Sequence, residues 1–192
     1  MVSLTPKKAD TLPLKMIAPD HGPVWRRDID LIVDLYATWA AQKPGRKAVI
    51  VYDTMWGSTA AMAKAIEDGL VAEGVRVKSM RLKENHRSNV ATEMLGAGAL
   101  VVGSPTLNNQ MFPSVADMLT YLKGLKPKNL VGAAFGRYGW SEAAVRQLAE
   151  AMNDLQVKMV ADPLSVQYVP DQEALIKCRE LGRKIAQAIQ VP

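Results

Sequence analysis

In most of the chain, short apolar runs alternate with segments of helical periodicity. Continuous apolar runs at 48–52, 99–102 and 130–135 have the length of strands that are buried on both faces. At 75–80 and 157–160, apolar and polar residues alternate instead, which is typical of outer, half-solvated strands. The pattern predicts a three-layer α/β/α fold around a five-stranded parallel sheet in the order 2-1-3-4-5.

Helical periodicity fills the intervals between these strands. The predicted helices span 59–70, 112–123, 141–155 and 175–189. Gly74 is expected to end the first of them, and Ser141 is a candidate N-cap of the helix that begins there. Cys178 and Gly182 lie on the apolar face of the last helix. We therefore expect a buried, unreactive thiol and a close approach of this helix to the sheet.

The first 45 residues differ from the rest and lack the pattern of an independent domain. They are expected to form an arm with a strand at 14–18, a turn at 19–23 and a helix at 28–41. Asp28 is a candidate N-cap of that helix. The apolar residues of the helix fall on two faces, but packing against one surface needs only one apolar face. The pattern therefore predicts that a second element packs against this helix. The sequence thus divides into an arm, 1–45, and a domain, 46–192.

Composition narrows the chemistry that this chain can perform. Its 192 residues include one Cys and two His. A disulfide framework needs at least two cysteines, and a zinc or iron site is normally built from three or four ligands, mainly Cys and His. We therefore expect no metal site within the chain and, because Cys178 stands alone, a reducing compartment.

The formal net charge is +5, but the basic residues are scattered and interleaved with acidic ones. No basic block with interleaved aromatic residues marks a nucleic-acid site, so the charge indicates at most a preference for an acidic partner. The chain has no apolar run of the roughly 18 residues that a membrane span requires, and its start lacks the apolar core of a signal peptide. We expect a cytoplasmic protein that binds neither nucleic acid nor membrane.

An open α/β sheet binds its ligands at the carboxyl ends of the strands. The first loop at this edge, residues 53–59, reads Asp-Thr-Met-Trp-Gly-Ser-Thr and joins a buried strand to a helix. It offers three hydroxyl groups and the amides of a helix N-terminus but no Lys or Arg, and the chain has no Gly-Lys-Ser/Thr triplet of a Walker loop. This predicts that neutral donors hold one terminal phosphate. The alternative is an ordinary Ser/Thr helix cap.

Two further loops at the same edge suit a planar ligand. The second loop, 104–110, supplies Thr, Asn and Gln side chains that donate and accept hydrogen bonds, as the edge of a heterocycle requires. The third loop, 135–141, places Tyr138 and Trp140 beside two glycines, so that rings can stack on a flat ligand. A phosphate pocket joined to a flat, hydrogen-bonding slot predicts flavin mononucleotide (FMN).

Three motifs carry a resemblance to a known family: Tyr-Asp-Thr-Met-Trp-Gly-Ser-Thr at 52–59, Gly-Ser-Pro-Thr-Leu-Asn-Asn at 103–109 and Phe-Gly-Arg-Tyr-Gly-Trp at 135–140. With them, residues 46–190 resemble the flavodoxin-like domain of flavodiiron proteins (A-type flavoproteins). The resemblance implies that the first loop holds the FMN phosphate, the second faces the ribityl chain and ring, and the third borders the isoalloxazine. The cofactor-binding residues that it implies are Thr54, Met55, Trp56, Gly57, Ser58, Thr59, Pro105, Thr106, Leu107, Asn108, Asn109, Gly136, Tyr138, Gly139 and Trp140.

The arm carries a second resemblance. Residues 15–25, which contain Pro-Asp-His-Gly, resemble the end of the metallo-β-lactamase-like domain that precedes the flavodoxin domain in that family. There the histidine of this motif is the last ligand of a di-iron centre. The family's other ligands have no counterpart in this sequence, and His86 matches no ligand position. We therefore expect His21 to be a remnant ligand that binds no metal here.

The resemblance implies an FMN-binding electron-transfer domain. It would take electrons from a donor such as rubredoxin and pass them to a di-iron site, absent from this sequence, that reduces oxygen or nitric oxide in the family. Subunits of the family pair head to tail, and the two-faced helix 28–41 is a candidate homodimer contact. No catalytic residue is assigned. The alternative is a self-contained NAD(P)H-dependent flavin (quinone) reductase. The sequence leaves open whether the chain is part of a longer flavodiiron protein or a short relative.

Overall fold

The computed structural model describes residues 12–189 and divides the chain into two units, one up to Lys43 and one from Pro44 onward. In the first unit, Ile17 and Trp25 pair through an isolated antiparallel bridge, with N–O distances of 2.9 and 2.8 Å. Among the described residues, the strand expected at 14–18 is reduced to this bridge, so that prediction was wrong.

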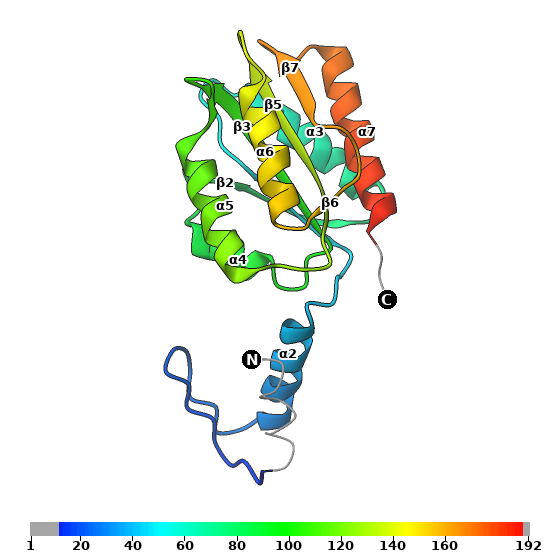
Figure 1. Cartoon of the computed structure of the whole chain (residues 1–192). Coiled ribbons are helices and arrows are strands. Elements are labelled where there is room, and N and C mark those ends of the chain that lie inside the picture. The colour runs from blue at the N-terminus through cyan, green and yellow to red at the C-terminus, as the bar shows by residue number, and fades with distance from the viewer. Residues whose placement is uncertain (1–11, 190–192) are drawn as a thin grey trace. The chain divides into compact units, whose positions relative to one another are not determined.

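Helix α2, Ile29–Ala41, confirms the helix expected in the first unit (Figure 1). Its start differs from the prediction. Asp28 has a left-handed backbone with φ of 55°, and within residues 12–189 its side chain makes no capping hydrogen bond. Asp28 is therefore not a side-chain cap. Along the helix, Ile32 is buried while Leu31 is 56% exposed.

The second unit is built on a parallel sheet with the main path β2-β1-β3-β5-β6. Its strands are β1 Lys47–Tyr52, β2 Arg76–Arg81, β3 Ala99–Leu107, β5 Val131–Tyr138 and β6 Lys158–Met159. The path confirms the expected order 2-1-3-4-5, with the first strand inside the sheet and the second at its edge. The buried runs of the sequence form the three central strands, because both faces of those strands are covered.

The last position in the sheet differs from the expectation of one strand at 157–160. It is divided between β6 and a further strand, β7 Leu164–Gln167, and both pair in parallel with β5. Pro163 stands in the break between them. Because proline has no N–H to donate to a ladder, it interrupts pairing. The prediction therefore missed the strand at 164–167.

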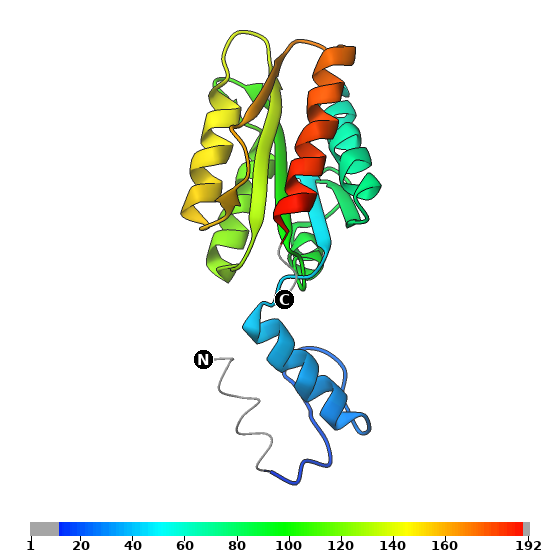
Figure 2. The ribbon, with the colours of Figure 1, turned by 90° about the vertical axis from the view of Figure 1, so that its right-hand side faces the viewer.

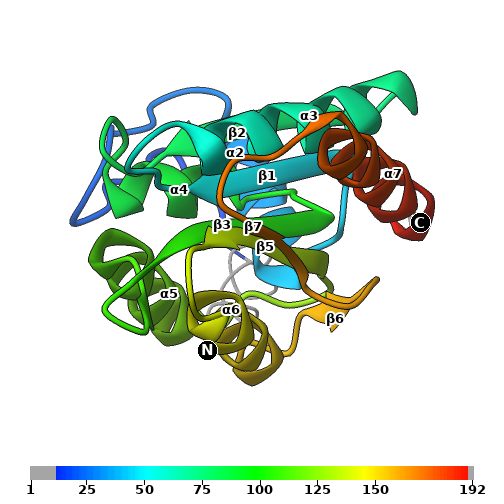
Figure 3. The same ribbon diagram turned by 90° about the horizontal axis from the view of Figure 1, so that it is seen from above.

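Helices cover both faces of the sheet and make the expected three layers (Figures 2 and 3). Those on one face are α3 Ser58–Ala72 and α7 Gln172–Ala188, and those on the other are α4 Arg87–Glu93, α5 Pro113–Leu125 and α6 Ala143–Asp154. Alternate strand residues supply the two cores: Ile50 packs with α3 and α7, and Val49 with the other helices. The N-cap residue of α6 is Glu142 and not Ser141, which corrects the prediction, although Ser141 Oγ accepts a hydrogen bond from Ala143 N at 3.3 Å.

Helices α3 and α7 lie side by side on their face of the sheet, as Figure 2 shows. Gly182 makes this possible, because a Cβ there would lie 2.2 Å from the carbonyl oxygen of Ile66. The close approach expected at Gly182 is thus to helix α3 and not to the sheet, which corrects the prediction. Cys178, which lies on α7 with Gly182, is fully buried, and burial raises the pKa of its thiol to about 11. The burial expected for this thiol is confirmed.

Candidate functional site

The segments that follow β1, β3 and β5 meet at one edge of the sheet. Tyr52 of β1 lies opposite Gly103 of β3, and Pro105 of β3 lies opposite Arg137 of β5. Because these strands are parallel and adjacent, their carboxyl ends share the upper edge in Figure 1, onto which Figure 3 looks. The structure therefore brings together the three segments that the sequence singled out.

Two of those segments are partly strand and not wholly loop. β3 continues to Leu107, and β5 continues to Tyr138. The expected site residues then distribute as follows: Thr54, Met55, Trp56 and Gly57 precede α3; Ser58 and Thr59 begin it; Pro105, Thr106 and Leu107 end β3; Asn108 and Asn109 form a turn; Gly136 and Tyr138 lie on β5; Gly139 and Trp140 follow it.

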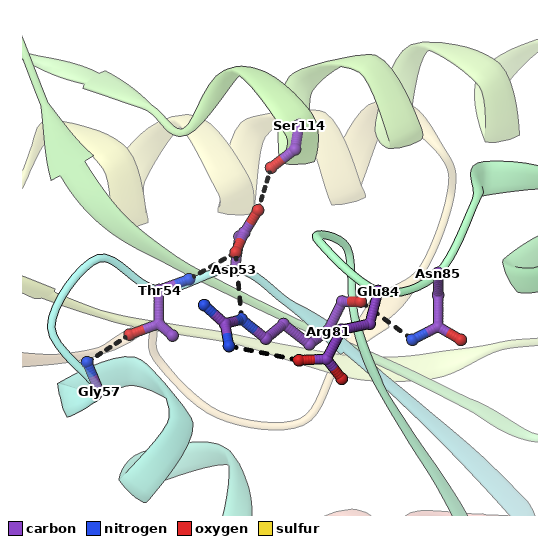
Figure 4. Close-up of polar contacts among 7 residues, drawn as sticks. All are labelled: Asp53, Thr54, Gly57, Arg81, Glu84, Asn85 and Ser114. Carbon is purple, nitrogen blue, oxygen red and sulfur yellow. Dashed lines mark hydrogen bonds and ion pairs between the residues drawn. The ribbon is translucent and has the colours of Figure 1, made fainter.

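The first loop is ordered by its own side chains (Figure 4). Thr54 N donates to Asp53 Oδ1 at 2.9 Å, and Gly57 N donates to Thr54 Oγ1 at 3.0 Å. Gly57 has φ of +88°, where residues with a Cβ are strained, and it is the N-cap residue of α3. A glycine at this position has no side chain to cap the helix. The ordinary Ser/Thr cap, which was the alternative interpretation of this loop, is therefore not what α3 has.

Two threonine hydroxyls near this edge are buried without a partner. Thr59 is fully buried in the first turn of α3, and Thr106 lies near the end of β3. Among the described residues, neither Oγ1 accepts or donates a hydrogen bond. Burying an unsatisfied hydroxyl costs about 1–3 kcal/mol, so such groups indicate an additional ligand or water. The first amides of α3 also have no partner within the helix. These donors suit a ligand with a phosphate group and a hydroxyl-bearing chain such as ribityl.

The second loop is a tight hairpin turn between β3 and β4, Gln110–Met111. Asn108 and Asn109 have φ of 49° and 58°, the two left-handed residues of a type I′ turn. Gln147 of α6 holds this turn from the side. Its Nε2 donates to Asn109 O at 3.3 Å, and its Oε1 accepts from Met111 N at 2.9 Å. The turn is therefore fixed by a helix that packs behind it.

The third loop carries an exposed aromatic ring on a fixed backbone. Trp140 is 94% exposed. Next to it, Gly139 O accepts a hydrogen bond from Gln167 Nε2 at 3.0 Å, which ties the loop to the end of β7. A hydrogen bond with Glu142 raises the pKa of the Tyr138 phenol above its ordinary value of 10.0. In the first loop, Trp56 is 85% exposed. Exposed rings of this kind can stack on a flat ligand.

The first residue of the first loop carries a buried carboxylate. Asp53 is 5% exposed, and its Oδ2 accepts from Ser114 Oγ at 2.6 Å, while Arg81 Nε lies 3.7 Å from Oδ1 (Figure 4). The sequence indicated no role for any of these residues, nor for Gln147 and Gln167. One signal was present: a charged residue directly follows a buried strand. Ser114, however, lies 61 positions along the chain, beyond the reach of any local pattern.

Neither histidine belongs to these three loops. His21 is exposed in the first unit. His86 is the N-cap residue of α4, and its Nδ1 accepts from Ser88 N at 3.3 Å. Over residues 12–189, no three His, Cys, Asp or Glu side chains are grouped so that they could hold a metal ion. In the same part of the chain, no helix has the length and apolar character needed to cross a membrane.

Comparison with known proteins identifies similar chains. A family model described as flavodoxin matches residues 50–182. A nitric oxide reductase from Moorella thermoacetica is 48% identical over 193 residues, covering 97% of this chain and 48% of the relative. The solved rubredoxin oxygen:oxidoreductase from Desulfovibrio gigas superposes with a TM-score of 0.91 at 37% identity, covering 97% of this chain and 49% of that one. The flavodiiron protein from Giardia intestinalis gives 0.89 at 31%, covering 96% and 47%. The chain spans about half the length of these relatives.

Proposed function

The chain belongs to the flavodoxin family, and from that premise we propose that it is the FMN-binding, electron-carrying part of a flavodiiron protein. Flavodoxins bind FMN, and bound FMN supplies one- and two-electron transfer. The observation that carries the proposal is the pair of buried, unpartnered hydroxyls of Thr59 and Thr106, near the carboxyl edge at which open α/β sheets bind their ligands. A buried hydroxyl without a partner costs free energy, and the phosphate and hydroxyl groups of FMN would supply the missing partners.

The roles of the individual residues follow from their chemistry. We assign the phosphate to the first loop, residues Thr54, Met55, Trp56, Gly57, Ser58 and Thr59, at the positive end of the α3 dipole. The amides of Thr54 and Gly57 already donate within the loop, so the phosphate is assigned to the hydroxyls and to the other amides. We assign the ribityl chain and one edge of the ring to Pro105, Thr106, Leu107, Asn108 and Asn109, and the other side of the ring to Gly136, Tyr138, Gly139 and Trp140. The ordered turn and the tied third loop support these assignments.

The electron path is the second part of the proposal. Because Trp56 and Trp140 are exposed, a flavin ring held beside them is within reach of another protein. We propose a rubredoxin-like donor, since one solved relative is a rubredoxin oxygen:oxidoreductase, and a di-iron domain as the acceptor, since another is a flavodiiron protein. A net charge of +5 suits an acidic donor.

The proposal is tested by adding FMN to the purified chain and then supplying electrons. FMN is expected to bind one per chain, with quenched flavin fluorescence, and reduced rubredoxin is expected to bleach the flavin absorbance without oxygen. NADPH with a quinone serves as the control. Failure of FMN to bind would remove the cofactor assignment. Rapid NADPH consumption without a partner protein would favour the self-contained reductase instead.

We also propose that two copies of the chain pair through helix 28–41. Leu31 and Tyr36 are 56% and 38% exposed on α2, more than a solvated helix face requires. Light scattering on the whole chain is expected to give a dimer that Leu31→Glu converts to a monomer. A wild-type chain that remains a monomer at high concentration would contradict the pairing. The proposal of FMN binding does not depend on this result.

A further inference from the structure

Asp53 is a buried charge at the base of the first loop. A carboxylate in this environment is costly unless it is hydrogen-bonded and paired. Two hydrogen bonds and one ion pair compensate it (Figure 4): the backbone N–H of Thr54 donates at 2.9 Å and the hydroxyl of Ser114 at 2.6 Å, while Arg81 Nε lies 3.7 Å away, beyond hydrogen-bond distance. No step of the proposed function so far uses this cluster, although Asp53 directly precedes the residues assigned to the phosphate.

The three partners come from three different elements. Thr54 opens the first loop, Arg81 is the last residue of β2, and Ser114 lies in the first turn of α5. Arg81 is itself fixed, because its Nη1 donates to Glu84 Oε1 at 3.3 Å and its carbonyl oxygen accepts from Asn85 Nδ2 at 2.9 Å. One carboxylate therefore joins the end of β1 to the edge strand and to the opposite helical layer.

The effect of Asp53 reaches the helix N-terminus through one intermediate residue. Asp53 fixes the amide of Thr54, and the hydroxyl of Thr54 in turn accepts from Gly57 N at 3.0 Å. Gly57, the N-cap residue that precedes α3, has a left-handed φ of +88°. The loop contains no Lys or Arg, so a phosphate must be held by amides and hydroxyls whose directions are set in advance.

We propose that Asp53 is a positioning residue for phosphate recognition: it does not contact FMN but fixes the donors of the first loop through Thr54 and Gly57. Arg81 balances its charge, so that the carboxylate does not repel the phosphate. This inference rests on the proposed FMN function. Its consequence is specific, because the loop contributes to binding of the phosphate and not of the flavin ring.

The test compares FMN with riboflavin, which has the same ring and ribityl chain but no phosphate. Dissociation constants are measured by flavin fluorescence for the whole chain and for Asp53→Ala, Asp53→Asn and Ser114→Ala. Asp53→Ala is expected to weaken FMN binding about tenfold and Ser114→Ala about threefold, with riboflavin binding unchanged. Asp53→Asn keeps an acceptor for Thr54 N and is expected to restore most of the difference between the two flavins.

Glu93→Gln is the matched control. It alters the ion pair of buried Lys47 at the opposite end of β1, with an Nζ–Oε2 distance of 2.8 Å, and is expected to leave both flavin affinities unchanged. Equal weakening of FMN and riboflavin in the Asp53 variants, or an unchanged FMN affinity in a folded Ser114→Ala, overturns the inference. An Asn variant as weak as the Ala variant does so as well. If the wild-type chain does not bind FMN at all, the proposed function itself is wrong.

Discussion

The two ends of the proposed FMN site are built in opposite ways. At the phosphate end, the hydroxyl-bearing residues Thr54, Ser58 and Thr59 are 8%, 9% and 0% exposed. At the ring end, Trp140 is 94% exposed and lies on a loop that one side-chain hydrogen bond ties to β7. One end thus consists of buried donors in a fixed backbone, and the other of a large aromatic side chain in water.

This difference assigns different tasks to the two ends. Buried donors that are already oriented lose little freedom when they bind, so the phosphate end can discriminate between ligands with and without a phosphate. An exposed ring adds stacking area but little discrimination, and it leaves the flavin open to a partner protein. We therefore expect changes at the phosphate end to alter FMN affinity most, and changes at the ring end to affect FMN and riboflavin equally.

The largest effect is expected for Thr59→Val, which replaces the buried hydroxyl with a methyl group of similar shape. A hydrogen bond to a charged group contributes about 1.5–3 kcal/mol, so FMN binding should weaken about 10- to 100-fold. The chain without flavin should become more stable by about 1 kcal/mol, because an unsatisfied buried hydroxyl is removed. Fluorescence titration and urea unfolding measure the two effects.

Thr120→Val is the matched control for this experiment. Its hydroxyl is exposed and donates to Ala116 O at 2.8 Å within α5, away from the site. This variant should bind FMN as the wild type does. A Thr59→Val chain that loses stability and keeps its FMN affinity would show that the hydroxyl has a structural role, which contradicts the assignment of the phosphate end.

A smaller effect is expected for Trp140→Ala at the ring end. Stacking of aromatic groups contributes about 0.5–1.5 kcal/mol, so FMN and riboflavin should both bind about three- to tenfold more weakly. The free energy of unfolding should not change, since the side chain is almost fully exposed. An effect on FMN alone would contradict the comparison, because it would make Trp140 part of phosphate recognition.

A still smaller effect is expected for Gln147→Ala, which frees the turn of the second loop. The variant loses the hydrogen bonds to Asn109 O and Met111 N but no group that is assigned to FMN contact. We expect about a two- to threefold loss of affinity, together with a loss of about 1 kcal/mol in the free energy of unfolding. Unchanged affinity with unchanged stability would show that the turn does not depend on Gln147.

The sequence predicted the layers and the strand order well, because both depend on local pattern. Runs such as 48–52 and 99–102 are continuous only if both faces are covered, and the structure buries them. The second piece of the divided last strand was missed although Leu164–Gln167 also alternates apolar and polar residues, because no local pattern shows that two short segments on either side of Pro163 pair with the same strand. Gly182 was correctly expected at a close contact, but periodicity identifies the buried face of a helix and not the element that it meets.

The candidate site divides in the same way. Hydroxyls, amides and aromatic rings at the strand ends were visible in the sequence, because each loop is a continuous segment. Their support was not visible. Asp53 is paired with residues of β2 and α5, and Gln147 reaches the second loop from α6. Such contacts depend on how distant elements pack, which no local pattern encodes. Residues that touch the ligand are thus easier to predict than those that position them.

Glu93→Gln is expected to leave FMN affinity unchanged while it changes the free energy of unfolding. Lys47 Nζ donates to this carboxylate, and that hydrogen bond lowers the pKa of Glu93 below its ordinary value of 4.5. The unfolded chain therefore binds the proton more tightly than the folded chain. The pair stabilises the fold fully above pH 4.5, and this stabilisation is lost as the pH falls through the lowered pKa.

The difference in unfolding free energy between wild type and variant should be present at neutral pH and disappear in acid, as urea unfolding at both pH values will measure. If FMN affinity at neutral pH changed as well, the two ends of β1 would be coupled, and the separation between a stabilising charge and a positioning charge would fail.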